Sequence, residues 1–222
     1  MRPGHLCGCA RERLAGGRDQ ACRVWQVPEM WARVGYPSLK PLASWVPDLV
    51  ARLAFVQRWV DGGKPPVFWL SGFYFPQAFI TGTLQNHARK YQLPVDTISF
   101  GFELRADSLD ACEASPPVDG AFVHGLFLEG ARWDADAHVL QESRPKELHT
   151  TLPVIHLQPI ANRQLAADGF YEAPVYKTLS RYGVLSTTGH STNFVMSIEL
   201  PSDQPQSHWV RRGVAALLAL RH

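Results

Sequence analysis

The stretch ISFGFELR, residues 98–105, marks the point at which the hydrophobic periodicity of this 222-residue chain changes. Its apolar residues occupy every second position, whereas apolar residues upstream of it recur every three or four positions. Alternation of this kind is typical of a strand with one buried face. The stretch therefore divides the chain into an N-terminal part that favours helices and a C-terminal part that favours strands.

Two helices are expected upstream of this strand. The first begins near Pro47 and ends at residues 62–63, Gly-Gly, and the apolar stripe that we expect to face the core consists of Leu49, Leu53, Val56 and Val60. The second spans residues 73–91, where Gly82 is expected to admit another backbone. A buried strand is expected between them at residues 67–70, and the proline-rich residues 27–47 are expected to wrap the core in an extended conformation.

Downstream of the strand the sequence alternates between short apolar runs and turn residues. We expect loops at residues 106–117 and 161–169, a strand at 121–128 and a strand near a sheet edge at 154–157. Residues 174–179 and 194–200 are expected to pair, and residues 209–220 to form a closing helix. This order indicates an α+β fold, with N-terminal helices followed by an antiparallel, barrel-like β-sheet and a short C-terminal helix.

Composition excludes several classes of protein. The net charge is +2 and no basic cluster extends beyond Arg211 and Arg212, so a nucleic-acid partner is not expected. No apolar run reaches the roughly 18–20 residues that cross a bilayer, so no membrane partner is expected either. The cysteines lack the spacing of a zinc site and are interpreted as free thiols: Cys7, Cys9, Cys22 and Cys112.

Residues 186–193, STTGHSTN, form the densest group of polar side chains. Ser186 or Ser191 could act as a nucleophile with His190 as base, which is the arrangement of a Ser/His hydrolase. The alternative is a turn between two strands in which the hydroxyl and amide groups bond their own backbone and Gly189 adopts a positive φ. Because no G-x-S-x-G sequence is present, the turn is favoured over catalysis.

Other candidate sites also have plainer interpretations. Asp134, Asp136 and His138 could hold a divalent cation, but a solvated loop is favoured because so few ligands are present. His87 and His156 are interpreted as core histidines, and the aromatic runs at residues 68–69 and 73–75 as core rather than as a ligand site. With no phosphate-binding loop and no dinucleotide motif, we expect no catalytic, cofactor-binding or metal residue and no cofactor.

From about residue 27 onward the sequence resembles the C-terminal end of a dynein heavy chain, most closely the axonemal type. Several separate blocks occur in the order typical of that family: YPSLKPLASWVPDL (36–49), FWLSGFYFPQAFITGTLQNHARKY (68–91), VHGLFLEGARWD (123–134), PVYKT (174–178), LSTTGHSTNFV (185–195), ELPSD (199–203) and HWVRRGVA (208–215). The resemblance implies residues 27–222 as this domain, incomplete on its N-terminal side, and residues 1–26 as an unmatched, poorly ordered extension.

The resemblance also implies a function. In the family this domain follows the sixth ATPase module, lies across one face of the motor ring and modulates the motor without hydrolysing ATP. The implied partners are the ring modules and other dynein subunits, with no direct microtubule site. The implied location is the cytoplasm and its cytoskeleton, including the ciliary axoneme. The sequence departs from the family by His149 where Tyr is usual and by His156 where Trp is usual. The alternatives are a truncated, free-standing interaction module, an inert fragment or a Ser/His hydrolase.

Overall fold

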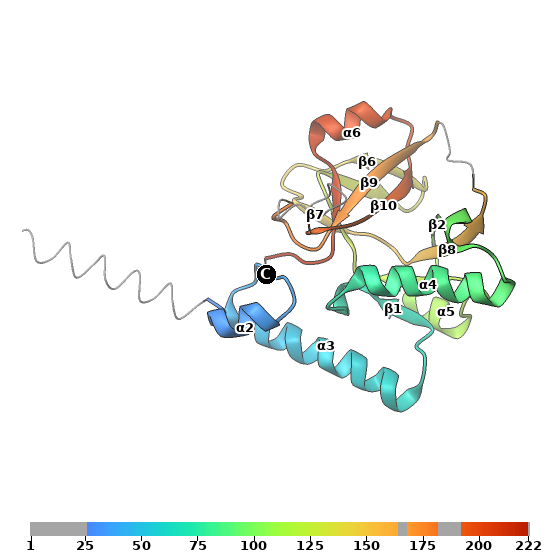
Figure 1. Ribbon diagram of the computed structural model, residues 1–222. Helices are drawn as coiled ribbons and strands as arrows, with labels where there is room; N and C mark the ends of the chain where they lie inside the picture. Colours follow the sequence, from blue (N-terminus) through green and yellow to red (C-terminus); the bar gives the residue numbers. More distant parts are fainter. Residues whose placement is uncertain (1–25, 164–167, 182–191, 222) are drawn as a thin grey trace, which may run out of the picture.

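The computed structural model describes residues 26–163, 168–181 and 192–221. It has the predicted mixture of helices and strands, with helices first along the sequence. Figure 1 shows the three N-terminal helices on one side of the molecule and the short C-terminal helix on the other side, with strands between them. These helices are α2 (Glu29–Val34), α3 (Leu42–Gly62), α4 (Pro76–Tyr91) and α6 (Gln206–Arg212).

The strands in the described part of the sequence form three sheets rather than the predicted barrel-like sheet. The first sheet has the order β1-β3-β8-β2, from β1 (Val67–Trp69), β3 (Ala121–His124), β8 (Ile155–Ala161) and β2 (Ile98–Leu104). The second has the order β10-β9-β11-β4-β7, from β10 (Phe194–Pro201), β9 (Phe170–Tyr176), β11 (Ala215–Leu217), β4 (Phe127–Glu129) and β7 (His149–Thr151). A separate hairpin joins β5 (Ala131–Asp134) to β6 (Val139–Glu142).

Neither large sheet is purely antiparallel. Strand β1 runs parallel to β3, and β11 runs parallel to β9, so the expectation of an antiparallel sheet needs correction. Parallel strands need a crossover connection that carries the chain from one end of the sheet back to the opposite end, and here the connections are long and contain helix α4 (from β1 to β3) or helix α6 (from β9 to β11). One continuous core joins both sheets to α3, α4 and α6, and it includes Phe55, Ile80, Leu128, Ile155 and Trp209.

The largest error in the predicted elements concerns the C-terminus. Residues 209–220 do not form one helix, because α6 ends at Arg212 and residues 215–217 form β11. Gly213 ends the helix with a φ of 67°, a conformation that glycine adopts without strain. The following apolar residues are fully buried because β11 lies inside the sheet between β9 and β4. A short apolar run of this kind has no periodicity that separates a helix from a buried strand.

The strand predicted at residues 121–128 is two strands in different sheets. The backbone turns at Gly125, whose φ is 90°, and passes from β3 into β4. A side chain on this glycine would meet the Trp69 ring at 2.6 Å and the Ser71 hydroxyl at 2.8 Å. Gly125 is therefore required both by the backbone conformation and by the close approach of the segment that follows β1.

The strand expected near a sheet edge lies inside the first sheet. β8 pairs with β3 on one side and with β2 on the other, and it continues through Pro159 to Ala161. Pairing with β3 ends at Leu157, so Pro159 has a strand neighbour on the β2 side only. Proline lacks an N–H group, but no strand on the β3 side of Pro159 needs a hydrogen bond from it.

Three further differences are local. The loop predicted at residues 106–117 contains helix α5 (Leu109–Ala114), and Ser108 caps it by accepting a hydrogen bond from the Ala111 N–H at 3.3 Å. The proline-rich segment contains helix α2, and α3 begins five residues before Pro47. Short 3₁₀ turns lie at η1 (Leu70–Gly72) and η2 (Val95–Thr97).

The expectation for residues 1–26 falls almost entirely outside the described residues. Within the described part of the sequence, no helix combines the length and the apolar composition needed to cross a membrane.

Candidate functional site

Three of the four residues of the predicted core stripe of α3, namely Leu53, Val56 and Val60, lie on the outside of the molecule, opposite to the prediction, and the fourth, Leu49, is half-buried. Leu53 is 55% exposed and Val60 is 75% exposed, whereas the residues of α3 that are buried are Trp45, Arg52 and Phe55. Figure 1 shows α3 along the outer edge of the molecule, with the sheets on one side of it only. We call the exposed aliphatic side chains of this helix the outer α3 face: Val46, Val50, Leu53, Val56 and Val60.

Helix α2 adds apolar side chains next to the N-terminal end of α3. Met30 and Val34 are strongly exposed, and Trp31 stacks on Trp45 of α3 with ring centroids 5.9 Å apart. Single exposed apolar residues are common, but a row of them along a regular helix indicates a surface that another element covers. The outer α3 face is therefore the strongest candidate for a functional surface in the described residues.

A buried arginine determines which side of α3 faces the core. Arg52 is 3% exposed, and its Nε donates to Asp48 Oδ2 at 2.8 Å. Its guanidinium lies over the Tyr36 ring at 3.7 Å, and Lys40 Nζ donates to Asp48 Oδ1 at 2.6 Å. Pairing and stacking offset the cost of burying this charge. Arg52 lies outside the stripe of apolar residues that the helical spacing assigned to the core.

Aromatic rings complete the inner side of α3. Phe55 packs edge-to-face against Trp69 and Phe73, with centroids 6.1 Å and 5.5 Å away, and Trp59 packs against Phe68 at 5.2 Å. Such pairs add to the free energy gained from burial alone. The aromatic runs at residues 68–69 and 73–75 thus belong mainly to the core, as predicted, except that Phe75 is 73% exposed.

The Asp48 carboxylate is expected to make stability depend on pH. Burial opposes its ionisation, but the hydrogen bonds from Lys40, Tyr36 and Arg52 outweigh burial and hold the pKa of Asp48 below its ordinary value. The contribution is therefore complete above the unfolded pKa of about 4 and is lost as the pH falls through the lower folded pKa. Urea unfolding from pH 6 to pH 2 is expected to show less loss of stability for Asp48→Asn than for the unaltered protein; equal losses would contradict the assignment.

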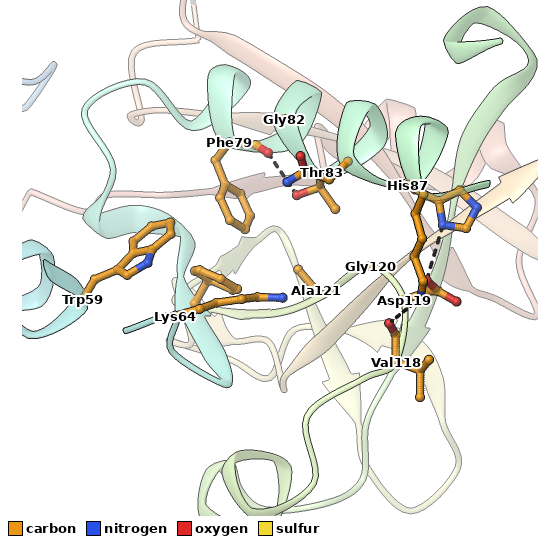
Figure 2. A pocket seen from close by; sticks show the side chains of 13 residues that line it. Trp59, Lys64, Phe79, Gly82, Thr83, His87, Val118, Asp119, Gly120 and Ala121 are labelled. Atoms are coloured by element: carbon orange, nitrogen blue, oxygen red, sulfur yellow. Dashed lines mark hydrogen bonds and ion pairs between the residues drawn. The ribbon is translucent and has the colours of Figure 1, made fainter. Parts of the chain in front are cut away.

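A second candidate site is a pocket of about 400 Å³ beside α4, shown in Figure 2. Thr83 and His87 of α4 lie on one side of it, and Lys64 and Asp119 lie across from them. His87 is not a fully buried core histidine, because it lines this pocket with its Nδ1 3.7 Å from Asp119 Oδ1. The sequence signal for this pocket was Gly82, which also lines it.

The candidate hydrolase residues Ser186, His190 and Ser191 lie outside the described residues. The strands on either side of them do pair as predicted, since β9 and β10 are antiparallel with a bulge between Phe194 and Met196. At the end of this segment the buried Asn193 amide donates to Thr178 Oγ1 at 3.1 Å and to the Ser180 carbonyl. Asn193 therefore bonds the two ends of the strand connection to each other.

Two of the remaining sequence candidates, Asp134 and His156, have hydrogen-bond partners within the domain. Asp134 Oδ1 accepts hydrogen bonds from the Asp136 and Ala137 N–H groups, both at 3.1 Å, in the turn between β5 and β6. His156 lies in β8 with its Nε2 2.9 Å from the Asp119 carbonyl oxygen. Among residues 26–163, 168–181 and 192–221, no three histidine, cysteine, aspartate or glutamate side chains are grouped so as to hold a metal ion.

Comparison with known proteins identifies the family. The family model for the C-terminal domain of the dynein heavy chain matches residues 22–218. The protein belongs to this dynein family. The match covers the helices and all three sheets of the described residues, and it includes the outer α3 face and the α4 pocket.

Individual dynein relatives agree with the family match. The sequence is 57% identical over 194 residues to dynein axonemal heavy chain 1 of Mus musculus, covering 87% of this protein and 4% of that relative. It is 54% identical over 197 residues to dynein axonemal heavy chain 3 of Homo sapiens, covering 89% of this protein and 5% of that relative. Dynein axonemal heavy chain 12 of Homo sapiens is 50% identical over 198 residues, covering 89% of this protein and 6% of that relative.

The dynein relatives are much longer than this protein. It spans about a twentieth of their length, so the similarity concerns one domain of each relative. A domain taken from a large protein has surfaces that its neighbours cover in the whole molecule, and the outer α3 face has the character of such a surface.

Proposed function

We propose that this dynein domain is a non-catalytic C-terminal region that packs on the ATPase ring of a microtubule motor and modulates ciliary movement. The observation that carries the proposal is the outer α3 face. Its five aliphatic side chains point away from the core although α3 is held firmly on its other side by Arg52. The relatives named axonemal dynein heavy chains support an axonemal location.

Several finer features belong to the same proposal. The domain extends over residues 27–222, its partners are the ring modules and other dynein subunits, and it has no direct microtubule, nucleic-acid or membrane site. The proposal includes no ATP site. A phosphate-binding loop needs a serine or threonine directly after its glycine and lysine, but the glycines that end α3 are followed by Lys64 and then Pro65. Proline supplies neither an amide hydrogen nor a hydroxyl group for a nucleotide. The polypeptide alone is therefore expected to show no ATP turnover.

Binding to a motor ring tests the proposal. The protein is mixed with an axonemal dynein heavy-chain motor fragment that lacks its own C-terminal domain, and binding is measured by calorimetry together with the ATPase rate of the ring. Leu53→Asp places a charge in the middle of the outer α3 face and is expected to weaken binding at least tenfold. A change in the ATPase rate on binding of the unaltered protein is also expected.

The matched control is Ala51→Asp, because Ala51 is exposed on the same helix but lies outside the outer α3 face. This variant is expected to bind within twofold of the unaltered protein. No binding by the unaltered protein, or equal loss in both variants, would contradict the proposal. Concentration-dependent self-association that Leu53→Asp abolishes would instead favour a free-standing module, and covalent labelling of a serine by an organophosphonate would favour a hydrolase.

A further inference from the structure

The α4 pocket differs in chemistry from the outer α3 face. Its floor is aromatic, from Trp59, Phe68 and Phe79, and its rim is polar and basic. Its volume of about 400 Å³ lies within the range typical of ligand-binding clefts. The pocket is therefore large enough for a bulky side chain and its neighbours.

Gly82 is the first indication that something other than this protein's own atoms occupies the pocket. It lies in the middle of α4, where glycine destabilises a helix relative to alanine. A Cβ at this position would meet no atom within 4 Å, so the expected close approach of another backbone does not occur in the described residues. The bare helix surface instead opens into the pocket. Glycine here would allow the main chain of an occupant to approach α4 closely.

The charges of the pocket indicate what it would accept. Lys90 Nζ is paired with Asp119 Oδ1 at 2.7 Å, so this lysine is largely neutralised. Lys64 has no hydrogen bond or ion pair with any described residue, and its Nζ lies 5.9 Å from the centre of the Phe68 ring. Figure 2 shows the Lys64 side chain extended across the pocket toward Ala121. An unpaired cation above an aromatic floor favours a group that combines an apolar body with an anion.

The shape of the site favours a polypeptide over a small molecule. The α4 residues that line it run from Phe79 to Lys90, which corresponds to about 16 Å along the helix. About five residues of extended polypeptide have this length. Asn86 is exposed in the middle of the row and has no hydrogen bond with a described residue, so its amide can bond a peptide backbone.

We propose that the α4 pocket binds an extended polypeptide segment in which an aromatic or bulky aliphatic side chain is adjacent to a carboxylate. The apolar side chain lies on Trp59, Phe68 and Phe79, and the carboxylate pairs with Lys64. The backbone of the segment passes over Gly82 and is bonded by Asn86. This site does not depend on ring binding by the outer α3 face, because the residues that line the two surfaces are different.

Peptide titration followed by NMR tests the site. The ¹⁵N-labelled full-length protein is titrated with the acetylated, amidated peptide Gly-Phe-Glu-Gly, and shift changes are expected at the Trp59 indole, at Gly82 and at Asn86. The same peptide with Gln in place of Glu is expected to bind at least fivefold more weakly. Phenylacetate, which has the ring and the carboxylate without a peptide backbone, is also expected to bind at least fivefold more weakly.

Substitutions assign these effects to the pocket. Lys64→Gln is expected to remove the preference for Glu over Gln, and Gly82→Leu, which fills the pocket from the helix side, is expected to weaken both peptides at least tenfold. Lys146→Gln and Gly62→Leu are the matched controls, since both residues are exposed and neither lines the pocket. Leu53→Asp is also expected to leave peptide binding unchanged.

Defined outcomes would overturn the proposal. These are no shift at the three reporter residues, equal affinity for the Glu and Gln peptides, and equal affinity for phenylacetate and the Glu peptide. The melting temperature of Gly82→Leu shows whether the variant is folded. If it is not, Gly82→Ala provides the test, because alanine keeps the helix and partly fills the pocket; this variant is expected to weaken peptide binding about threefold.

Discussion

Arg52→Ala is expected to destabilise the domain by about 3 kcal/mol, because it removes one partner of a buried ion pair. The side chain lies between Asp48, the Tyr36 ring and the Phe73 carbonyl oxygen, which accepts from its Nη1 at 3.4 Å. Without it the half-buried Asp48 carboxylate loses one of its two cationic partners and keeps only Lys40, and the Tyr36 ring loses the guanidinium stacked on it. Urea unfolding followed by circular dichroism measures the change in the free energy of unfolding.

The control for this prediction is Arg58→Ala on the same helix. Arg58 is exposed, so its replacement by alanine is expected to change the free energy of unfolding by less than about 0.5 kcal/mol. Arg52→Lys keeps the charge but cannot both stack on Tyr36 and reach Asp48 in the same geometry, so an intermediate loss is expected. If Arg52→Ala and Arg58→Ala were equally mild, the buried network would not be what holds α3 in place.

Trp209→Ala is expected to cost about 4 kcal/mol, within the range typical of deleting a buried tryptophan. Trp209 is 1% exposed and lies in the core between α6 and the second sheet, with the Tyr171 ring 6.3 Å away. Its indole Nε1 also donates to Ser202 Oγ at 2.7 Å. The substitution therefore leaves a cavity in the core and removes one of the hydrogen bonds of the buried Ser202.

Val210→Ala is the neighbouring control. Val210 follows Trp209 in α6 but is 58% exposed, so its loss is expected to change the free energy of unfolding by less than about 0.5 kcal/mol. Calorimetric melting of the two variants measures the contrast. Similar melting temperatures for the two variants would show that α6 is not part of the core.

The candidate surfaces show where sequence patterns stop being informative. The spacing of Leu53, Val56 and Val60 correctly predicts an amphipathic helix, but it cannot tell which side of the helix faces this domain. That side is decided by Arg52 and Phe55, whose partners Tyr36 and Phe73 lie outside α3 in the sequence. For the α4 pocket the sequence signal was limited to Gly82, because Lys64 and Asp119 are brought near this glycine only by the packing of α4 against the first sheet.

The sequence by itself determined the α+β class, the positions of α3, α4 and β2, the pairing of the last long strands and the dynein resemblance. These features depend on local periodicity, turn residues and runs of identity, all of which are readable along the sequence. The tertiary structure decided the division into three sheets, the place of β8 and β11 inside them and the outward orientation of α3. Each of these depends on contacts between residues far apart in the sequence, and periodicity carries no information about such partners.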